Sequence, residues 1–292
     1  MVQILRAELV ANPGAALGES PLAEGSDNLR WIDMPAGAVW NTVISTGRSE
    51  KIVHAGPLGC IARAGDGGLL LASGDSVEHC SLGGSASAPI RLFEDSGLRL
   101  NDGKIDPWGR LVVGSACVDG TRERGHLYTI GPDSSVAISR GGITMSNGLD
   151  WSPDRRRFYH VDTPRQRIDL YEVDPDDGQV LGQAVFAEIR AGRGLPDGLT
   201  VDAEGRLWLA VWGSGCVIGF DPSGVEFARI TVPVPNVTSC GFGGPALEIL
   251  FITTAANSAS DPDDAALGGA LFACRTAVSG QPARRFGALA GS

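Results

Sequence analysis

Short runs of apolar residues recur along the chain, each preceded by a turn-like group of Asp, Pro, Gly or Asn. Five to seven apolar, β-prone residues in a row are typical of one strand. Six such phrases occur: SDNLRWIDM (26–34), GDGGLLLASG (65–74), DPWGRLVVGS (106–115), SPDRRRFYHVDT (152–163), DAEGRLWLAVW (202–212) and GPALEILFITTA (244–255). They are spaced 39 to 49 residues apart. This period predicts an all-β, six-bladed β-propeller in which each phrase forms an innermost strand.

The segments between the phrases also read as strands. A second β-like run follows most phrases, at 37–44, 126–131, 167–174, 215–222 and 269–276. We expect these runs to be neighbouring strands joined by hairpins, and residues 4–10 (ILRAELV) to complete the last blade and close the ring. No charged or Pro-rich linker divides the chain, which predicts a single domain over residues 1–292. A β-sandwich is the alternative, but it would not explain six similar phrases.

Composition narrows the class of protein. The 41 glycines among 292 residues suit a chain with many tight turns. A net charge of −10 argues against a nucleic-acid partner. No apolar run approaches the roughly 18 residues of a membrane helix, residues 1–13 lack a signal-peptide pattern, and the six cysteines form no CxxC pair. We therefore expect a soluble cytoplasmic protein with reduced thiols, no membrane partner, and a monomeric or weakly homo-oligomeric state.

Three segments carry candidate metal ligands. LGESP (17–21), MSNGLDWS (145–152) and GLPDGLTVD (194–202) each place one oxygen-bearing side chain beside Gly or Pro, namely Glu19, Asn147 and Asp197. Two carboxylates and one amide give a charge of −2, which suits Ca²⁺, Mg²⁺ or Mn²⁺ and also allows Zn²⁺. Asn-Gly and Asp-Gly are also ordinary turn dipeptides, so spacing alone leaves a purely structural role open.

A fourth segment adds hydrogen-bonding groups. RLNDGKIDPWGR (99–110) contains Arg99, Asn101, Asp102 and Lys104 just before the third phrase. Taken alone, NDGK is a turn. Together with the other three segments, it supplies donors for an oxygen-rich organic ligand.

These four segments, in this order, resemble the SMP-30/gluconolactonase/regucalcin-like family of six-bladed propellers. The resemblance runs from about Gly18 to Phe286 and includes PVPNVTSCGFGG (233–244) and GGALFACRTAVSGQPARRF (268–286). Any one of these motifs is weak evidence, but the ordered set is specific. The resemblance implies hydrolysis of a small-molecule lactone, such as a sugar lactone, to the open acid with one bound divalent metal ion (Ca, Zn, Mg or Mn).

The resemblance also implies roles for particular residues. Glu19, Asn147 and Asp197 match the family's metal ligands. Arg99 and Asn101 match residues that hold the substrate, with Asn101 also near the metal, and Asp119 falls where some relatives have a substrate-contacting Glu. Asp197 is in addition the expected general base, accepting a proton from the attacking water.

Other readings stay open at this point. Many relatives read GEGP followed by a bulky residue where this chain has Ser20 and Ala23, which suggests a lactone or ester other than a simple aldonolactone. Asp150 is a further candidate contact. The same site could serve phosphotriester or ester hydrolysis, a cyclase or an isomerase. A non-catalytic calcium-binding regulatory protein is the third class, although a metal store would not need Arg99 and Asn101.

Overall fold

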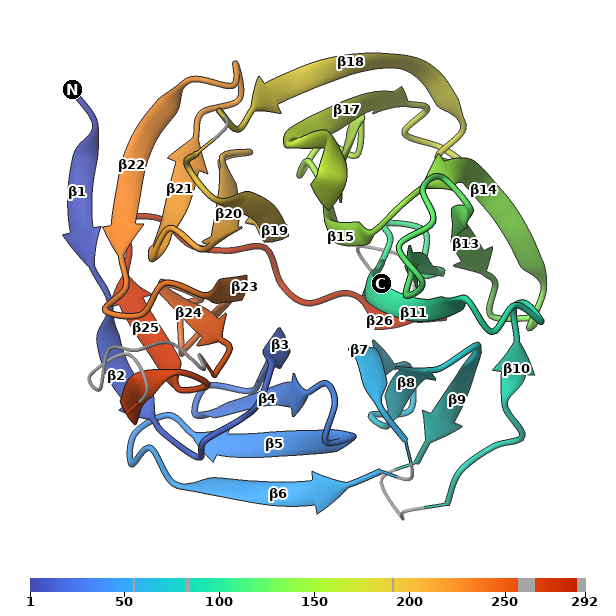
Figure 1. Ribbon diagram of the computed structural model, residues 1–292, viewed down its shortest axis with the longest axis horizontal. Helices are drawn as coiled ribbons and strands as arrows, with labels where there is room; N and C mark the ends of the chain where they lie inside the picture. The colour runs from blue at the N-terminus through green and yellow to red at the C-terminus, as the bar shows by residue number, and fades with distance from the viewer. Residues whose placement is uncertain (55, 82–84, 191, 257–265, 288–292) are drawn as a thin grey trace.

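Six β-sheets are arranged around a central axis like the blades of a propeller (Figure 1). The structure is a computed structural model and describes residues 1–54, 56–81, 85–190, 192–256 and 266–287. The predicted six-bladed β-propeller is therefore confirmed. In the part of the chain that is described, no helix has the length and apolar character needed to cross a membrane.

The blades follow one another in chain order. Blade 1 contains β3 (Gly18–Glu24), β4 (Asn28–Asp33), β5 (Ala38–Val43) and β6 (Ser49–Val53). Blade 2 contains β7 (Leu58–Ala64), β8 (Leu69–Ser73), β9 (Ser76–Cys80), β10 (Ile90–Arg91) and the distant β26 (Arg285–Phe286). Blade 3 contains β11 (Leu98–Ile105), β12 (Leu111–Cys117), β13 (Gly125–Ile130) and β14 (Val136–Ile143).

The second half repeats this plan. Blade 4 contains β15 (Ser146–Trp151), β16 (Arg157–Asp162), β17 (Arg167–Val173) and β18 (Val180–Glu188), with the 3₁₀ helix η1 (Thr163–Arg165) between β16 and β17. Blade 5 contains β19 (Leu195–Val201), β20 (Leu207–Trp212), β21 (Cys216–Phe220), β22 (Glu226–Thr231) and the distant β1 (Gln3–Arg6). Blade 6 contains β23 (Val237–Gly243), β24 (Ile249–Thr254), β25 (Leu271–Arg275) and the distant β2 (Glu8–Ala11).

The repeated phrases form the second strand of each blade, so their predicted place as innermost strands is wrong. They supply β4, β8, β12, β16, β20 and β24. The innermost strands are β3, β7, β11, β15, β19 and β23 (Figure 1). Four of them, β3, β11, β15 and β19, carry the candidate motifs themselves. The second strands give the clearer sequence signal because they are long apolar runs buried on both faces. The innermost strands are interrupted by polar residues that face the axis.

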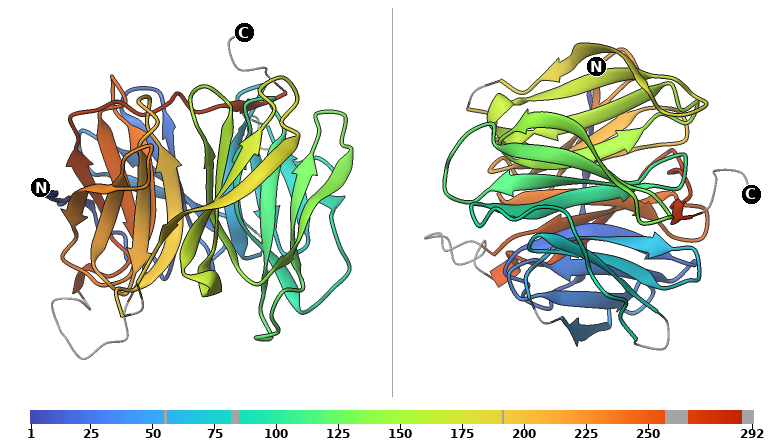
Figure 2. Two further views of the ribbon diagram at one scale, coloured as in Figure 1. Left: turned by 90° about the horizontal axis from the view of Figure 1, so that it is seen from above. Right: turned by 90° about the vertical axis from the view of Figure 1, so that its right-hand side faces the viewer.

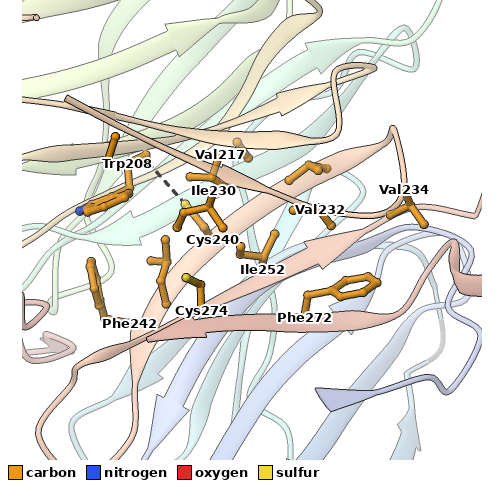
Figure 3. Close-up of a cluster of buried hydrophobic side chains, with 14 of the residues drawn as sticks. Trp208, Val217, Ile230, Val232, Val234, Cys240, Phe242, Ile252, Phe272 and Cys274 are labelled. Atoms are coloured by element: carbon orange, nitrogen blue, oxygen red, sulfur yellow. Dashed lines mark hydrogen bonds between the residues drawn. The ribbon is translucent and has the colours of Figure 1, made fainter. Parts of the chain in front are cut away.

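Burial falls from the axis outward. Every residue of β15 and of β23 is buried, whereas the outer strands β14 and β18 are largely exposed. Side chains of neighbouring blades fill the space between the sheets. Figure 3 shows one such cluster, in which Trp208 and Ile230 of blade 5 pack against Phe242 and Ile252 of blade 6.

Three terminal strands close the ring. β2 pairs antiparallel with β25 and completes blade 6, as predicted for residues 4–10. The same run is split, however, because β1 pairs in parallel with β22 and adds a fifth strand to blade 5. At the other terminus, β26 pairs in parallel with β7 of blade 2. The segment that leads to β26 crosses one end of the ring (Figure 2).

Candidate functional site at one end of the central axis

Four innermost strands bring the predicted site residues to the same end of the axis, where those strands begin. We call this the entry end, and the opposite end, where the innermost strands finish, the exit end. Glu19 lies on β3, Asn101 on β11, Asn147 on β15 and Asp197 on β19. All four side chains are buried, with exposures between 3% and 8%. The structure thus brings together residues that are up to 178 positions apart in the sequence.

A local break in strand pairing positions each of these side chains. The pairing of the innermost strand with its neighbour shifts between Glu19 and Leu22, between Leu100 and Gly103, between Ser146 and Leu149, and between Pro196 and Leu199. Bulges of this kind bend a strand and re-aim its side chains, and they are frequent next to functional sites. The turn-like dipeptides in the sequence therefore mark bulges within strands, not loops before them.

Two glycines allow the strands to come this close to the axis. A Cβ on Gly148 would lie 2.7 Å from the carbonyl oxygen of Asp197, and a Cβ on Gly198 would lie 2.7 Å from Cα of Ser239. Both distances are shorter than real Cβ contacts. Asn-Gly and Asp-Gly occur here because the backbones of adjacent blades touch, and the purely turn-forming interpretation of these pairs is wrong.

A chain of hydrogen bonds fixes the two amides. Arg99 Nη1 donates to Asn101 Oδ1 (2.5 Å), and Asn101 Nδ2 donates to Asn147 Oδ1 (2.8 Å) and to the carbonyl oxygen of Ser146 (2.6 Å). Asn147 Nδ2 donates in turn to Thr163 Oγ1 (2.7 Å), and that hydroxyl donates to the carbonyl oxygen of Pro196 (2.9 Å). Both amide oxygens keep one free lone pair for a ligand.

Electrostatics at the entry end favour a cation. Burial raises the pKa of Glu19 well above its usual value, and the charges of Asp197 and Asp102 raise it further, against smaller opposing effects of the Ser20 N–H and of Arg99. Burial and the charge of Asp102 likewise raise the pKa of Asp197. Asp102, one step deeper along the axis, has a pKa of about 6, chiefly because of burial. A divalent cation would remove this repulsion, and two carboxylates with one amide are hard oxygen ligands.

The predicted substrate contacts differ in their surroundings. Arg99 is half-buried beside the amides. Asp119 lies on the loop after β12 at the same end of blade 3, where its Oδ2 accepts from Arg124 Nη1 (2.6 Å). Arg124 also binds Asp95, so this acidic side chain belongs to an exposed ion-pair group beside Gly97, just before β11.

Three residues that depart from the family pattern, Ser20, Ala23 and Asp150, line a cavity of their own, although Ser20 directly follows Glu19 and donates its backbone N–H to Glu19 Oε2 (3.3 Å). Ser20 has φ 55°, a conformation that favours glycine, and its hydroxyl accepts from the backbone N–H of Ile61 (3.2 Å). Ser20 and Ala23 both line a cavity of about 100 Å³ further along the axis. Asp150 lines the same cavity and is held there by Lys104 and Arg284, so it is a buried partner of cations.

Sequence reasoning missed Thr163, which orients Asn147 from the start of η1. The only signal is its place as the last residue of the fourth repeated phrase. His160 is buried and packs against Phe158, with Ser146 Oγ 2.9 Å from its Nε2. Burial lowers its pKa to about 3, so the ring is a neutral core side chain.

Comparison with known proteins gives a consistent result. A family profile for the SMP-30/Gluconolactonase/LRE-like region matches residues 17–256. The chain is 32% identical to a regucalcin of Xenopus laevis over 86% of this chain and 87% of that protein. It is also 32% identical to a pentonolactonase of Haloferax volcanii over 94% of this chain and 95% of that protein. Among solved structures, a calcium-binding regucalcin of Agrobacterium tumefaciens superposes with a TM-score of 0.90 at 26% identity, covering 98% of this chain and 99% of that one.

Proposed function

Because the chain belongs to the SMP-30/gluconolactonase/LRE-like family, we propose that it hydrolyses a lactone to the hydroxy acid with the help of one divalent metal ion. The observation that carries this proposal is the pair of buried carboxylates, Glu19 and Asp197, at the entry end. Their pKa values are raised by burial and by like charges, and fixed hydrogen-bonding groups stand beside them. Relatives named pentonolactonase and putative sugar lactone lactonase support the reaction class.

The three ligand candidates suit the ion. Glu19, Asn147 and Asp197 would hold it, with a charge of −2 balancing its own. In such a site a bound divalent ion polarises a carbonyl oxygen and lowers the pKa of a water molecule. Oxygen ligands alone do not select among Ca²⁺, Mg²⁺, Mn²⁺ and Zn²⁺, so the identity of the ion stays a prediction.

Asp197 is the proposed base. Its carboxylate would accept a proton from the water that attacks the lactone carbonyl carbon. The ring C–O bond then breaks, and Asp197 returns this proton to the leaving ring oxygen, which gives a carboxylic acid and a hydroxyl group. The acid loses its proton at neutral pH. Because water is the nucleophile in this reaction, no catalytic serine is required, and the sequence has no GxSxG motif.

Arg99 and Asn101 would bind the organic part of the substrate in different ways. Both hydrogens on Asn101 Nδ2 are already donated within the protein, so Asn101 is left with an acceptor oxygen that suits a substrate hydroxyl. Toward the residues that the structure describes, Arg99 donates only through Nη1, which leaves donors for a carbonyl or ring oxygen. This combination of donor and acceptor suits a polyhydroxylated lactone.

A second candidate is a calcium-binding protein without catalysis. It is favoured by the likeness to a calcium-binding regucalcin, which covers almost the whole of both chains. This candidate leaves the fixed Arg99–Asn101 pair without a purpose, so we favour the enzyme.

A panel of lactones tests the proposal directly. Ring opening releases a proton, which a pH indicator detects during hydrolysis. We expect activity on at least one hydroxylated lactone, loss of activity in EDTA, and recovery on adding back one of Ca²⁺, Mg²⁺, Mn²⁺ or Zn²⁺.

Two results would contradict this expectation. Stoichiometric metal binding without activity on any lactone or ester would favour the calcium-binding candidate. Full activity in EDTA would contradict the metal requirement.

A further inference from the structure

The exit end of the axis carries a group of cations that the proposed reaction does not use. Arg63 lies near the end of β7, Arg285 lies on β26, and Arg284 precedes it on the segment that crosses the ring (Figure 2). Arg63, Arg284 and Lys104 line the cavity of about 100 Å³, together with the carboxylates of Asp102 and Asp150. This concentration of positive charge stands out in a chain whose net charge is −10.

Arg63 and Arg285 lack acidic partners. They are register partners in the parallel pair of β7 and β26, so their backbones are adjacent. Neither forms an ion pair within 4.0 Å among the residues that the structure describes. Nη2 of Arg63 donates to the carbonyl oxygen of Ala23, whereas its Nε is buried and has no hydrogen-bond partner in the described part of the chain.

The nearby carboxylates are already engaged. Asp150 accepts from Lys104 Nζ (2.9 Å) and Arg284 Nη1 (3.2 Å), and also from the backbone N–H of Val201 (2.9 Å). Glu24 pairs with Arg30 at 2.8 Å. The pKa of Arg63 is lowered, chiefly by burial and further by the charges of Arg285 and Arg30. The charge of Glu24 opposes this shift but does not outweigh it. Asp102 lies deeper, toward the entry end.

We propose that Arg63 and Arg285 form a binding site for a small tetrahedral oxyanion, either inorganic phosphate or the phosphate group of a monoester. A guanidinium presents its N–H groups as a planar fork that matches two oxygens of such an anion. The anion would accept from Nη1 of Arg63, because Nη2 is engaged by Ala23 and Nε is buried, and it would neutralise two adjacent like charges. It would also strengthen the existing link between β26 and β7, because each strand supplies one of the two arginines. Binding requires none of the residues at the entry end.

Titration calorimetry with inorganic phosphate tests this site. Divalent ions are first removed, because phosphate would also bind a metal at the entry end, and ionic strength is held constant with chloride. We expect saturable binding that weakens about tenfold or more in Arg63→Gln, which loses charge-assisted hydrogen bonds. The more exposed Arg285→Gln should weaken it about threefold. Arg48→Gln, which removes an exposed arginine paired with Glu50, is the matched control and should bind as the wild type does.

Arg285→Gln keeps the test decisive if Arg63→Gln does not fold, because Arg285 is exposed. A phosphate monoester titrated in parallel distinguishes the two sources, since tighter binding of the monoester indicates a phosphorylated small molecule and tighter binding of phosphate indicates the free anion. Absence of saturable binding overturns the proposal. Wild-type affinity for phosphate in both Arg63→Gln and Arg285→Gln also overturns it. Loss of phosphate binding in Arg99→Gln overturns it as well, because the anion would then lie at the entry end.

Discussion

The two ends of the central axis are built from the same innermost strands but have opposite electrostatic character. At the entry end, burial and like charges raise the pKa values of Glu19 and Asp197. At the exit end, burial also raises the pKa of Asp150, but Lys104 and Arg284 outweigh it and the pKa lies below its usual value. The pKa values of buried carboxylates on the innermost strands thus shift in opposite directions, because different charges face them. The acidic end is suited to a cation and the basic end to an anion.

Asp197→Asn should have the largest effect on the proposed reaction. The variant loses the proposed base and one negative metal ligand, so we expect the specificity constant to fall by about 10²- to 10⁴-fold, the range for a general base. Elemental analysis should show weaker metal binding. Asp221→Asn, in the turn between β21 and β22, removes a carboxylate far from the axis and should retain full activity. Normal turnover and metal content in Asp197→Asn would assign the base and the ligand elsewhere.

Arg99→Ala should reduce hydrolysis without removing metal. Arg99 cannot coordinate a cation, and a hydrogen bond to a charged or developing charged group contributes about 1.5–3 kcal/mol. The specificity constant on the best lactone should therefore fall about 10- to 150-fold, with metal content unchanged. Arg99→Lys, which keeps the charge but not the planar fork, should recover part of the loss. Loss of metal together with activity would instead give Arg99 a structural role.

The raised pKa of Asp102 predicts a pH dependence of the metal-free protein. Its pKa rises from the usual 3.8 to about 6 in the folded state, so the folded protein holds more protons than the unfolded chain between these values. The contribution of Asp102 to the free energy of unfolding is fully present below about pH 4 and is lost as the pH rises through about 6. We expect Asp102→Asn to reduce that decline by about 1–2 kcal/mol in denaturant titrations at several pH values. An unchanged pH profile would contradict a raised pKa at this position.

Asp119→Asn should have the smallest effect. The carboxylate is exposed and already held by Arg124. Exposed ion pairs of this kind contribute about 0–1 kcal/mol, so we expect the specificity constant to change about threefold or less. The specificity constants of Asp119→Asn and Arg99→Ala are measured on the same lactone and compared. A loss as large as that of Arg99→Ala would show that Asp119 reaches the substrate, as the family resemblance implies.

The sequence located the blades and the candidate site residues but misplaced the repeated phrases along the radius of the propeller. The repeat of apolar phrases predicts six blades because each blade must bury one such strand between its neighbours. The same reasoning placed the phrases at the axis, where polar residues of the true innermost strands lie instead. Glu19, Asn147 and Asp197 were identified through motifs, whereas the bulges that turn them toward the axis depend on pairing with the second strands.

Local sequence by itself determined the strand repeat, the acidic charge and the oxygen-bearing motifs, because each depends on residues close together in the chain. Tertiary structure alone decided which charges meet. Asp150 is paired with Arg284, 134 residues away, and Arg63 lies beside Arg285 because a terminal strand returns to blade 2. The pKa of a buried carboxyl depends on the charges within a few ångströms of it. Only the closed ring determines those neighbours, and with them which end of the axis is acidic and which is basic.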